Sequence, residues 1–492
     1  ALNNNSSSAI IPTTSNLEIN TSIDFTANTK TLPTGSHVKI LDEQSKWITN
    51  ITLYDNKARP IYVHSKNELL YTEDISNIKL DFVGNILQTH NKHINNIGIT
   101  TIVDKFTYDH ALRLLKQTQQ INGQAEELIV FNDYDELGQL KQKKVGGIDS
   151  QDNYNNTNAL QDIDYSYNIR GWLTSINDPK DMNTHNDLFS FGINYNKPNG
   201  PSSSTYYNNP LYNGNISHVL WKTDNIDSDL KHYSYRYDAL NRLTRAFYAE
   251  NERYNGKFNM NIYNYDRNGN ILDLYRSKIS PNNTNYGTGM DRLYYTYDSG
   301  NKLMKVRDSY NYSNTGVEGF KDGNTVGNDY TYDDNGNMLE DKNKNIINIE
   351  YNHLNLPKKV EFGSGNNHGN SYIQYYYDAT GVKLRKKVIE YTGTNGQSSM
   401  TTNYEDAFIT ESSGSYSYNG QYWVGSNVDK GIKFISQPEG YIESDNQGGF
   451  DYVFQYKDHL GNIRLSYADK NNDGVITGGS SQVFYDDFES AS

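Results

Sequence analysis

The fold of this chain can be inferred from one short stretch, Tyr295-Thr296-Tyr297-Asp298-Ser299-Gly300-Asn301-Lys302-Leu303. Its two tyrosines lie two positions apart, and side chains that far apart share one face of a β-strand. Asp298 can hydrogen-bond to the backbone two residues further on, and Gly300 can adopt the positive φ that a short chain reversal requires. Leu303 then returns on the second strand, opposite the tyrosines. The stretch therefore predicts a β-hairpin with one aromatic face.

The same unit recurs along much of the chain, which is typical of repeat proteins. A hairpin with a single apolar face is marginally stable alone, so we expect successive copies to stack into one long, twisted sheet. Chance Tyr-Asp pairs in a chain rich in both residues are the alternative, but composition does not explain the recurring Gly and Leu downstream. The copies begin at Tyr54-Asp55, Tyr108-Asp109, Tyr134-Asp135, Tyr237-Asp238, Tyr265-Asp266, Tyr332-Asp333 and Tyr377-Asp378, with weaker ones at Tyr167-Asn168, Tyr195-Asn196 and Tyr351-Asn352.

Aromatic side chains supply the material for a core. The mean hydropathy of -0.83 and the 35% of hydrophobic residues would by themselves suggest disorder. However, the chain contains 43 Tyr, 16 Phe and 4 Trp, so that 13% of its 492 residues are aromatic. Each such ring can bury about 150–250 Å². Tyrosine is therefore expected to take the place of aliphatic residues in the core.

Composition also excludes several classes of function. The chain has no cysteine, which rules out disulfides, thiol nucleophiles and Cys-ligated zinc. A net charge of -14 argues against nucleic-acid binding, since affinity for phosphate needs clustered Lys and Arg. No apolar run approaches the ~20 residues of a membrane-spanning helix. The first residues, Ala1-Leu2-Asn3-Asn4-Asn5, lack the features of a signal peptide, so the sequence is expected to be a processed product or a fragment.

The repeat divides the chain into four regions. Two insertions rich in Ser, Asn, Gly and Thr, at residues 196–209 and 392–402, are predicted to be exposed loops. The regions are a non-repeat segment at 1–46, the repeats at 47–402, a closing segment at 403–468 and a polar tail at 469–492.

The closing segment carries the most specific motifs. They are Pro438-Glu439-Gly440-Tyr441, Phe450-Asp451-Tyr452-Val453-Phe454-Gln455-Tyr456 and Lys457-Asp458-His459-Leu460-Gly461-Asn462-Ile463-Arg464-Leu465-Ser466-Tyr467. Together with the Tyr-Asp repeat they resemble the bacterial YD-repeat (RHS) family, and the last motif resembles its repeat-associated core. The resemblance covers roughly residues 47–489. It implies an all-β fold in which YD-repeat hairpins stack into a long, spiralling sheet that forms a hollow shell, incomplete at the C-terminus.

The same resemblance implies a function. In this family the shell is followed by a variable C-terminal domain, often a toxin, that a self-cleaving aspartyl site releases. The present sequence stops at Ser492, before any Asp-Pro-x-x-Gly motif. We therefore expect a non-catalytic carrier with its own C-terminal effector domain or the secretion machinery as partner. It is expected to be secreted, or held at the surface of a Gram-negative bacterium, by a specialised route such as type IX secretion.

A calcium site is one interpretation of the tail. Asp469, Asn471 and Asp473 place oxygen atoms at positions one, three and five of a loop with Gly474 at position six. Val475 and Thr477 would complete the Ca²⁺ ligands. Ser480 stands where a bidentate Glu is expected, although Asp486 or Glu489 could fold back. A plain Asp/Asn/Gly turn explains the same residues equally well.

The core-like motif admits a catalytic and a structural interpretation. Asp458, His459 and Arg464 could form a general acid/base cluster. The motif also follows the strand, turn, strand scheme of the repeats. In that case Asp458 is the turn residue, Gly461 takes the positive φ, and Arg464 pairs with Asp458 across the hairpin. The structural interpretation is favoured.

Two other classes of protein remain as alternatives to a shell. A carbohydrate-binding or adhesion protein would use aromatic rings such as Trp221 or Trp423 to stack on sugars. A glycosidase with paired carboxylates is the weaker alternative, because turns already account for the many Asp residues. His90 and His93 could share a metal on a helix, but on a strand they face opposite ways and are predicted to lie at the surface.

Overall fold

A computed structural model describes most of the chain as antiparallel β-structure. The only helix among the described residues is a single 3-10 turn, η3 (Lys342–Lys344), between β22 and β23. The described residues are 29–43, 45–148, 159–182, 186–197, 209–224, 229–251, 253–310, 318–445, 448–471, 474, 476 and 482–484.

Two sheets follow each other along the chain. The first contains β1 (Gly35–Lys39), β2 (Trp47–Tyr54), β3 (Pro60–Asn67), β4 (Thr72–Leu80), β5 (Ile86–Ile94), β6 (Ile99–Tyr108), β7 (Leu114–Ile121), β8 (Glu127–Tyr134), β9 (Leu140–Val145), β10 (Gln161–Tyr167), β11 (Leu173–Ile176), β12 (Phe189–Asn194), β13 (His218–Thr223), β14 (Lys231–Tyr237), β15 (Leu243–Glu250), β16 (Arg253–Tyr254), β17 (Met260–Tyr265), β18 (Ile271–Ser280), β19 (Asn283–Tyr297) and β20 (Leu303–Asp308). The second contains β21 (Tyr330–Tyr332), β22 (Met338–Asp341), β23 (Ile346–Tyr351), β24 (Pro357–Asn366), β25 (Gly369–Tyr377), β26 (Lys383–Thr392), β27 (Gly396–Glu405), β28 (Phe408–Tyr418), β29 (Trp423–Gln437), β30 (Gly440–Ser444), β31 (Phe450–Lys457), β32 (Ile463–Ala468) and β33 (Gln482–Phe484).

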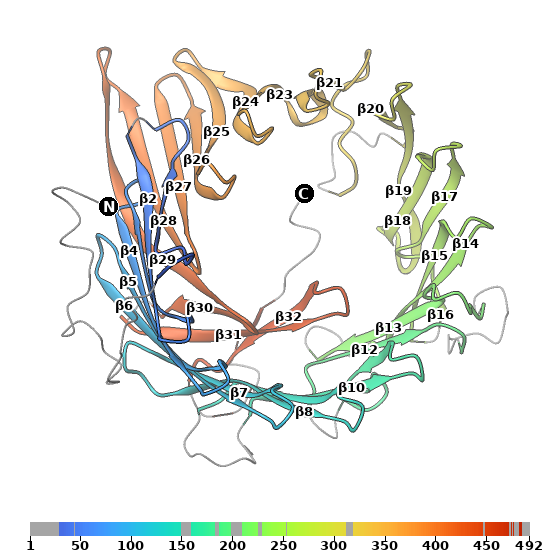
Figure 1. The fold of residues 1–492 in the computed structure, drawn as a ribbon. Coiled ribbons are helices and arrows are strands. Elements are labelled where there is room, and N and C mark those ends of the chain that lie inside the picture. The colour runs from blue at the N-terminus through green and yellow to red at the C-terminus, as the bar shows by residue number, and fades with distance from the viewer. Residues whose placement is uncertain are drawn as a thin grey trace.

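Within each sheet, each strand pairs antiparallel with its neighbour along the chain, except that β17 pairs with β15 and not with the short β16. Figure 1 shows the strands following one another around a ring-shaped wall. Strands β25 to β29 come back beside β2 to β6, and β30 to β32 cross on the inner side of β7 to β10. The all-β class and the spiralling sheet of stacked hairpins are confirmed.

The Tyr-Asp hairpins have a bulge at a fixed place. In the hairpin from Tyr295 to Leu303, Tyr297 pairs with Leu303, and the register shifts between Thr296 and Tyr297. The positive φ lies at Asn301 (65°) and not at Gly300, so that detail of the prediction is wrong. The bulge requires a left-handed residue three positions after the aspartate, a conformation that Asn tolerates. Glycine occupies the equivalent position in other hairpins, at Gly269, Gly336 and Gly381.

The loop predicted at residues 392–402 is also wrong. These residues form the end of β26 and most of β27, which pair without interruption from Thr392–Gly396 to Arg385–Asn403. Thr has a branched side chain that favours strands, so a polar Ser/Thr run can extend a hairpin as well as a loop. Strand β27 runs through residue 402, where the repeats were expected to end. The other predicted loop, at 196–209, lies almost entirely outside the described residues.

The ring closes where the second sheet meets the start of the first. Ile40 forms an antiparallel bridge with Asp378, and the backbone N–H of Ala379 donates to Lys39 O at 2.8 Å. A small core of buried side chains fills this junction: Ile40, Leu69, Leu70 and Leu384. A surface ion pair, Lys358 Nζ to Asp42 Oδ1 at 3.0 Å, joins the same two parts of the chain. One turn of the spiral is therefore about 340 residues long.

Candidate functional site: repeat clasps, closing segment and seam

In most of the repeats the tyrosine hydroxyl donates to a backbone carbonyl of the preceding hairpin. Tyr265 Oη donates to Leu243 O at 2.5 Å, and Leu243 is the sixth residue after Tyr237, the tyrosine of the preceding copy. The same relation holds at distances of 2.6–3.2 Å for Tyr134 to Leu114, Tyr195 to Leu173, Tyr332 to Leu303, Tyr351 to Met338 and Tyr377 to Pro357. Tyr108 and Tyr237 make equivalent bonds to Ile86 O and Ile216 O, although the corresponding earlier position is not a tyrosine there. This recurring contact, which we call the tyrosine clasp, gives a reason why the repeat uses Tyr rather than Phe.

The aspartate after each tyrosine holds the hairpin turn. Asp55 Oδ1 accepts hydrogen bonds from the N–H groups of Lys57 and Arg59, both at 2.9 Å, and Oδ2 accepts one from Arg59 Nε at 2.7 Å. Burial raises the pKa of Asp55, but the Arg59 side chain and these N–H groups outweigh it, so the pKa is lowered overall. Arginine recurs at the same place in the turns of Asp109 and Asp238, and asparagine replaces it in those of Asp81, Asp266 and Asp333.

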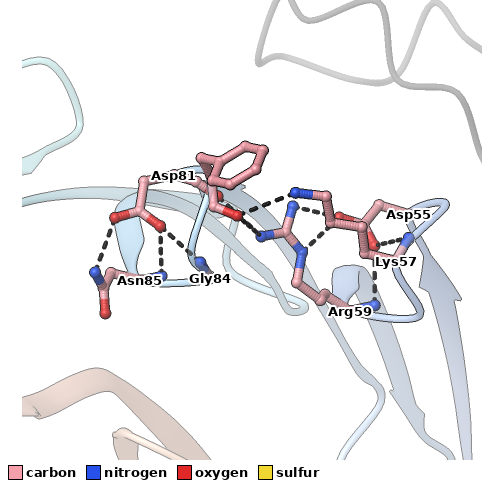
Figure 2. Close-up of polar contacts among 7 residues, drawn as sticks. Asp55, Lys57, Arg59, Asp81, Gly84 and Asn85 are labelled. Carbon is pink, nitrogen blue, oxygen red and sulfur yellow. Dashed lines mark hydrogen bonds and ion pairs between the residues drawn. The ribbon is translucent and has the colours of Figure 1, made fainter.

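Neighbouring turns are also tied to each other. Figure 2 shows the turns of Asp55 and Asp81 side by side. Arg59 Nη1 donates to Asp81 O at 2.9 Å, and Lys57 Nζ donates to Phe82 O at 3.1 Å. Arg59 therefore fixes its own turn and reaches the next one, and Arg242 does the same, with Nη1 donating to Asp266 O at 3.4 Å. These bonds make the stack of hairpins continuous along the edge where the turns lie.

Removing one clasp hydroxyl is expected to destabilise the protein modestly. Tyr237→Phe deletes the bond from Tyr237 Oη to Ile216 O, 2.9 Å long, and leaves the ring in place. We expect a loss of about 1 kcal/mol in the free energy of unfolding. Urea unfolding measures it, with Tyr286→Phe as the control, because Tyr286 is exposed. Equal losses for the two variants would contradict the role of the clasp.

The closing segment packs on the inner side of the wall. Phe454, Tyr456, Leu465 and Tyr467 are at most 1% exposed and share one core with side chains of β8 to β13. Tyr456 Oη donates to Gln161 Oε1 at 2.7 Å, and burial raises the pKa of Tyr456 well above its usual value. Nearby, Lys143 Nζ lies 2.9 Å from Glu439 Oε1, across 296 positions in sequence.

The core-like motif has the geometry of a repeat turn. Asp458 Oδ1 accepts hydrogen bonds from the N–H groups of Leu460 and Asn462, and Oδ2 lies 2.6 Å from Arg464 Nη2. Gly461 has a φ of 83°. Burial lowers the pKa of His459, whose ring stacks on Phe191 with centroids 5.6 Å apart. Because Asp458 is already bonded at both oxygens, this arrangement supports the structural interpretation over the catalytic one.

The tail residues proposed as calcium ligands are described only in part. Asp469 Oδ2 accepts a hydrogen bond from the N–H of Gly474 at 2.7 Å, which closes a turn. Asn471 is an exposed turn residue, and Asp473, Val475 and Thr477 lie outside the described residues. Across the described residues there is no group of three His, Asp or Glu side chains placed to hold a metal ion. The calcium loop therefore stays a prediction.

A buried ionic cluster lies at the seam between the first and last parts of the spiral. His93 of β5 lies 2.6 Å from Asp74 Oδ1 through Nδ1 and 3.0 Å from Glu405 Oε2 through Nε2. Its ring stacks on Phe408 with centroids 4.0 Å apart. Burial opposes protonation, but the two carboxylates outweigh it and raise the pKa of His93 to about 9. The predicted surface position of His93 is wrong, because the returning strands β27 and β28 cover this face.

A polar cavity opens beside this cluster. It has a volume of about 370 Å³ and is lined by residues that include Asp74, His93, Asp104, Phe408 and Gln437. Burial raises the pKa of Asp104, which accepts hydrogen bonds from Gln117 and Gln119. The cavity combines residues of β3 to β7 with residues of the second sheet. Sequence reasoning missed it, since no local motif marks residues that meet only when the ring closes.

Two histidines form a buried pair in the wall. His218 Nε2 lies 3.1 Å from His232 Nδ1, and both residues are almost completely buried. Burial lowers the pKa of His218 to about 3 and that of His232 to about 4. These pKa values include a smaller lowering of His218 by the neighbouring His232 and of His232 by Lys180. Both rings are therefore neutral at neutral pH.

This pair predicts a loss of stability in mild acid. The folded pKa values lie below 6.5, so between pH 6.5 and about 4 only the unfolded chain takes up these protons. Stability attributable to the pair should fall by about 2–3 kcal/mol between pH 7 and pH 5.5. Urea midpoints across this range measure it. The double variant His218→Asn, His232→Asn should have a flatter profile, and an unchanged slope would contradict the assignment.

The tryptophans considered for sugar binding are engaged in packing. Trp221 stacks on Tyr233 with centroids 5.6 Å apart and belongs to the margin of the main core. Trp423 lies among His368, Tyr391 and Tyr418 at the end of the long hairpins. These contacts account for both rings without a glycan.

Comparison with known proteins gives a likeness at the level of fold. No protein-family model and no curated protein sequence matches this chain. Among solved structures, a crystal structure of TcdB2-TccC3 is similar, with a TM-score of 0.50, 13% identity and coverage of 87% of this chain. A second structure, TcdB2-TccC3-TEV, matches the same share at 12% identity and a TM-score of 0.41. This chain spans 23% of the length of either, so what it shares with TcdB2-TccC3 is the fold of one part of that chain.

Proposed function

We propose that this chain is a wall segment of an RHS/YD-repeat shell that encloses a C-terminal effector, often a toxin in this family, for delivery to other bacteria or to a host. The observation that carries the proposal is the closing segment, which packs on the inner side of a ring of hairpins. Tyrosine clasps join successive repeats, and a wall built in this way is suited to enclosing another polypeptide. The fold shared with TcdB2-TccC3 adds support.

The container acts through mechanical stability and not through chemistry. Its acidic side chains at the turns are engaged as caps, as Asp55 and Asp458 illustrate. The partner is the chain's own effector domain, or the machinery that exports it. We propose that the protein is secreted or held at the surface of a Gram-negative bacterium, through a specialised secretion route. These proposals rest on the family resemblance.

Electron microscopy of the full-length gene product tests the proposal. The expected result is a hollow body with density for an enclosed polypeptide. Limited proteolysis provides a second readout, because an enclosed effector should survive protease until the wall is unfolded. A solid particle or an extended rod, or an effector that is digested while the wall stays intact, would overturn the proposal.

A further inference from the structure

The polar cavity at the seam has a floor that belongs to the inner face of the wall. Ile102 of β6 and Ile121 of β7 are paired and share a core with Tyr452 of the closing segment, which lies on the inner side (Figure 1). Asp104 follows Ile102 by two positions, so its side chain is on the same face, and Gln119 pairs with it across the strands. Both residues line the cavity. The cavity is therefore on the side of the wall where an enclosed chain would be.

Two glutamines of the cavity each have one amide end without a partner. Gln119 is 6% exposed and Gln437 is 8% exposed. Gln119 Nε2 donates to Asp104 Oδ1 at 2.8 Å, and Gln119 Oε1 has no hydrogen bond among the described residues. Gln437 Oε1 accepts the N–H of Glu439 at 2.9 Å, and in the same part of the chain Gln437 Nε2 has no acceptor. Buried polar atoms are nearly always bonded, so this pair indicates a ligand that offers a donor to Gln119 and an acceptor to Gln437.

The carboxylate of Asp104 has only neutral partners among the described residues. Oδ1 accepts hydrogen bonds from Gln117 Nε2 at 3.1 Å and from Gln119, and Oδ2 accepts one from Thr89 Oγ1 at 3.2 Å. A carboxylate has about four lone-pair sites, so one site on Oδ2 stays open. Asp104 is 6% exposed, and a buried charge is normally paired with a charge of opposite sign. A cation bound in the cavity would supply that charge.

The basic residues that line the cavity do not supply it. His93 is already engaged by Asp74 and Glu405, which are two carboxylates for one positive charge. Lys92 stands between Asn91 and His93 on β5, so its side chain points to the other face of the strand. The cavity therefore keeps an excess of negative charge.

An organic cation fits this site better than a metal ion. The described residues contain no group of three His, Asp or Glu side chains placed to hold a metal. An ammonium or guanidinium group carries its own N–H donors, which suit Asp104 Oδ2 and Gln119 Oε1. Phe106 also lines the cavity and offers its ring to an apolar stem or to a guanidinium plane. The volume of about 370 Å³ lies within the range of ligand pockets, roughly 300–1,000 Å³.

The free donor of Gln437 distinguishes a peptide from a simple amine. Lys and Arg side chains have no acceptor, so Gln437 Nε2 needs a separate carbonyl, which the main chain of a basic residue provides. We propose that the cavity binds a Lys or Arg residue of the enclosed polypeptide, with the basic group at Asp104 and Gln119 and a main-chain carbonyl at Gln437. The polypeptide source rests on the proposed function, since a container holds a chain at this face.

Isothermal titration calorimetry of the 492-residue chain tests the site with three small probes. Nα-acetyl-arginine amide should bind. Nα-acetyl-citrulline amide has nearly the same shape without the charge, and it should bind at least about tenfold more weakly, because its hydrogen bond to Asp104 is no longer charge-assisted on both sides. Ethylguanidinium keeps the cation but lacks the carbonyl, and it should also bind more weakly than Nα-acetyl-arginine amide.

A neutral variant and a matched control locate the binding. Asp104→Asn keeps the shape of the side chain and should lower the affinity for Nα-acetyl-arginine amide at least about tenfold. Asp133→Asn removes the same charge from β8, where the side chain of Asp133 is 53% exposed, and should bind like wild type. Circular dichroism and urea midpoints establish that all three proteins are folded. If Asp104→Asn does not fold, the arginine and citrulline probes still decide the question on wild type.

Several results would overturn the proposal. They are a wild-type chain that does not bind Nα-acetyl-arginine amide, equal affinity for the citrulline probe, and a folded Asp104→Asn variant with unchanged affinity. Equal affinity for ethylguanidinium would assign the cavity to a free organic cation and not to a polypeptide. Because these titrations contain no effector, their failure is distinct from failure of the container, which electron microscopy of the full-length product decides.

Discussion

Phe454→Ala is expected to lower the free energy of unfolding by about 3–5 kcal/mol. Phe454 is fully buried in the core between the closing segment and the wall, and its ring packs against Tyr452 and Tyr467. Alanine would leave a cavity between two sheets that are tied at other points, so the site could collapse only in part. Urea unfolding measures the loss.

The same substitution should also change how protease cleaves the closing segment. If the segment is docked on the wall, Phe454→Ala should also expose β31 and β32 to protease before the wall unfolds. Leu460→Ala is the matched control, because Leu460 lies in the same closing segment but is exposed. It should leave both the midpoint and the cleavage pattern unchanged. A small effect of Phe454→Ala on both measurements would argue against the docked arrangement.

His93→Ala is expected to cost about 3–5 kcal/mol near neutral pH. The substitution would leave the Glu405 carboxylate, whose side chain is only 2% exposed, without its cationic partner at the seam. Its remaining bond is the one from Thr410 Oγ1 at 3.0 Å. His110→Ala provides the control, since His110 is an exposed turn residue. It should change the unfolding midpoint little.

The effect of His93→Ala should depend on pH. The folded pKa of His93, about 9, lies above its usual value of 6.5. A raised pKa means that the stability contributed by this proton is fully present below pH 6.5 and is lost as pH rises through about 9. The difference between wild type and variant should therefore be largest at pH 6 and shrink by pH 10. A difference that stays constant over this range would contradict the charged cluster.

The repeat was predictable from sequence because its determinants are local. Tyr295 to Leu303 contain the strand period, the capping aspartate and the turn, so the hairpin follows from a few residues. The position of the left-handed residue was missed by one place, because both Gly300 and Asn301 tolerate that conformation and only the bulge register distinguishes them. The motif around Asp458 was likewise placed in a turn, since it follows the same scheme.

Contacts between distant parts of the chain could not be read from sequence. The partner of a clasp hydroxyl depends on how one hairpin stacks on the last, which the Tyr-Asp pattern leaves open. His93 was expected at the surface because strand periodicity gives a face but not what covers it. Its cover comes from β27 and β28, more than 300 positions later in the chain. The residues 392–402 show the same limit, since their polar composition hid a long hairpin.

Zero-length carbodiimide cross-linking tests ring closure most directly. Lys358 Nζ and Asp42 Oδ1 lie 3.0 Å apart, and both side chains are partly exposed. The account predicts a covalent link between peptides that contain these two residues, formed within the monomer and absent from Asp42→Asn. If the monomer yields no such link while the short-range pair Lys359–Glu361, 2.6 Å apart, is coupled, the chain does not close into the ring described.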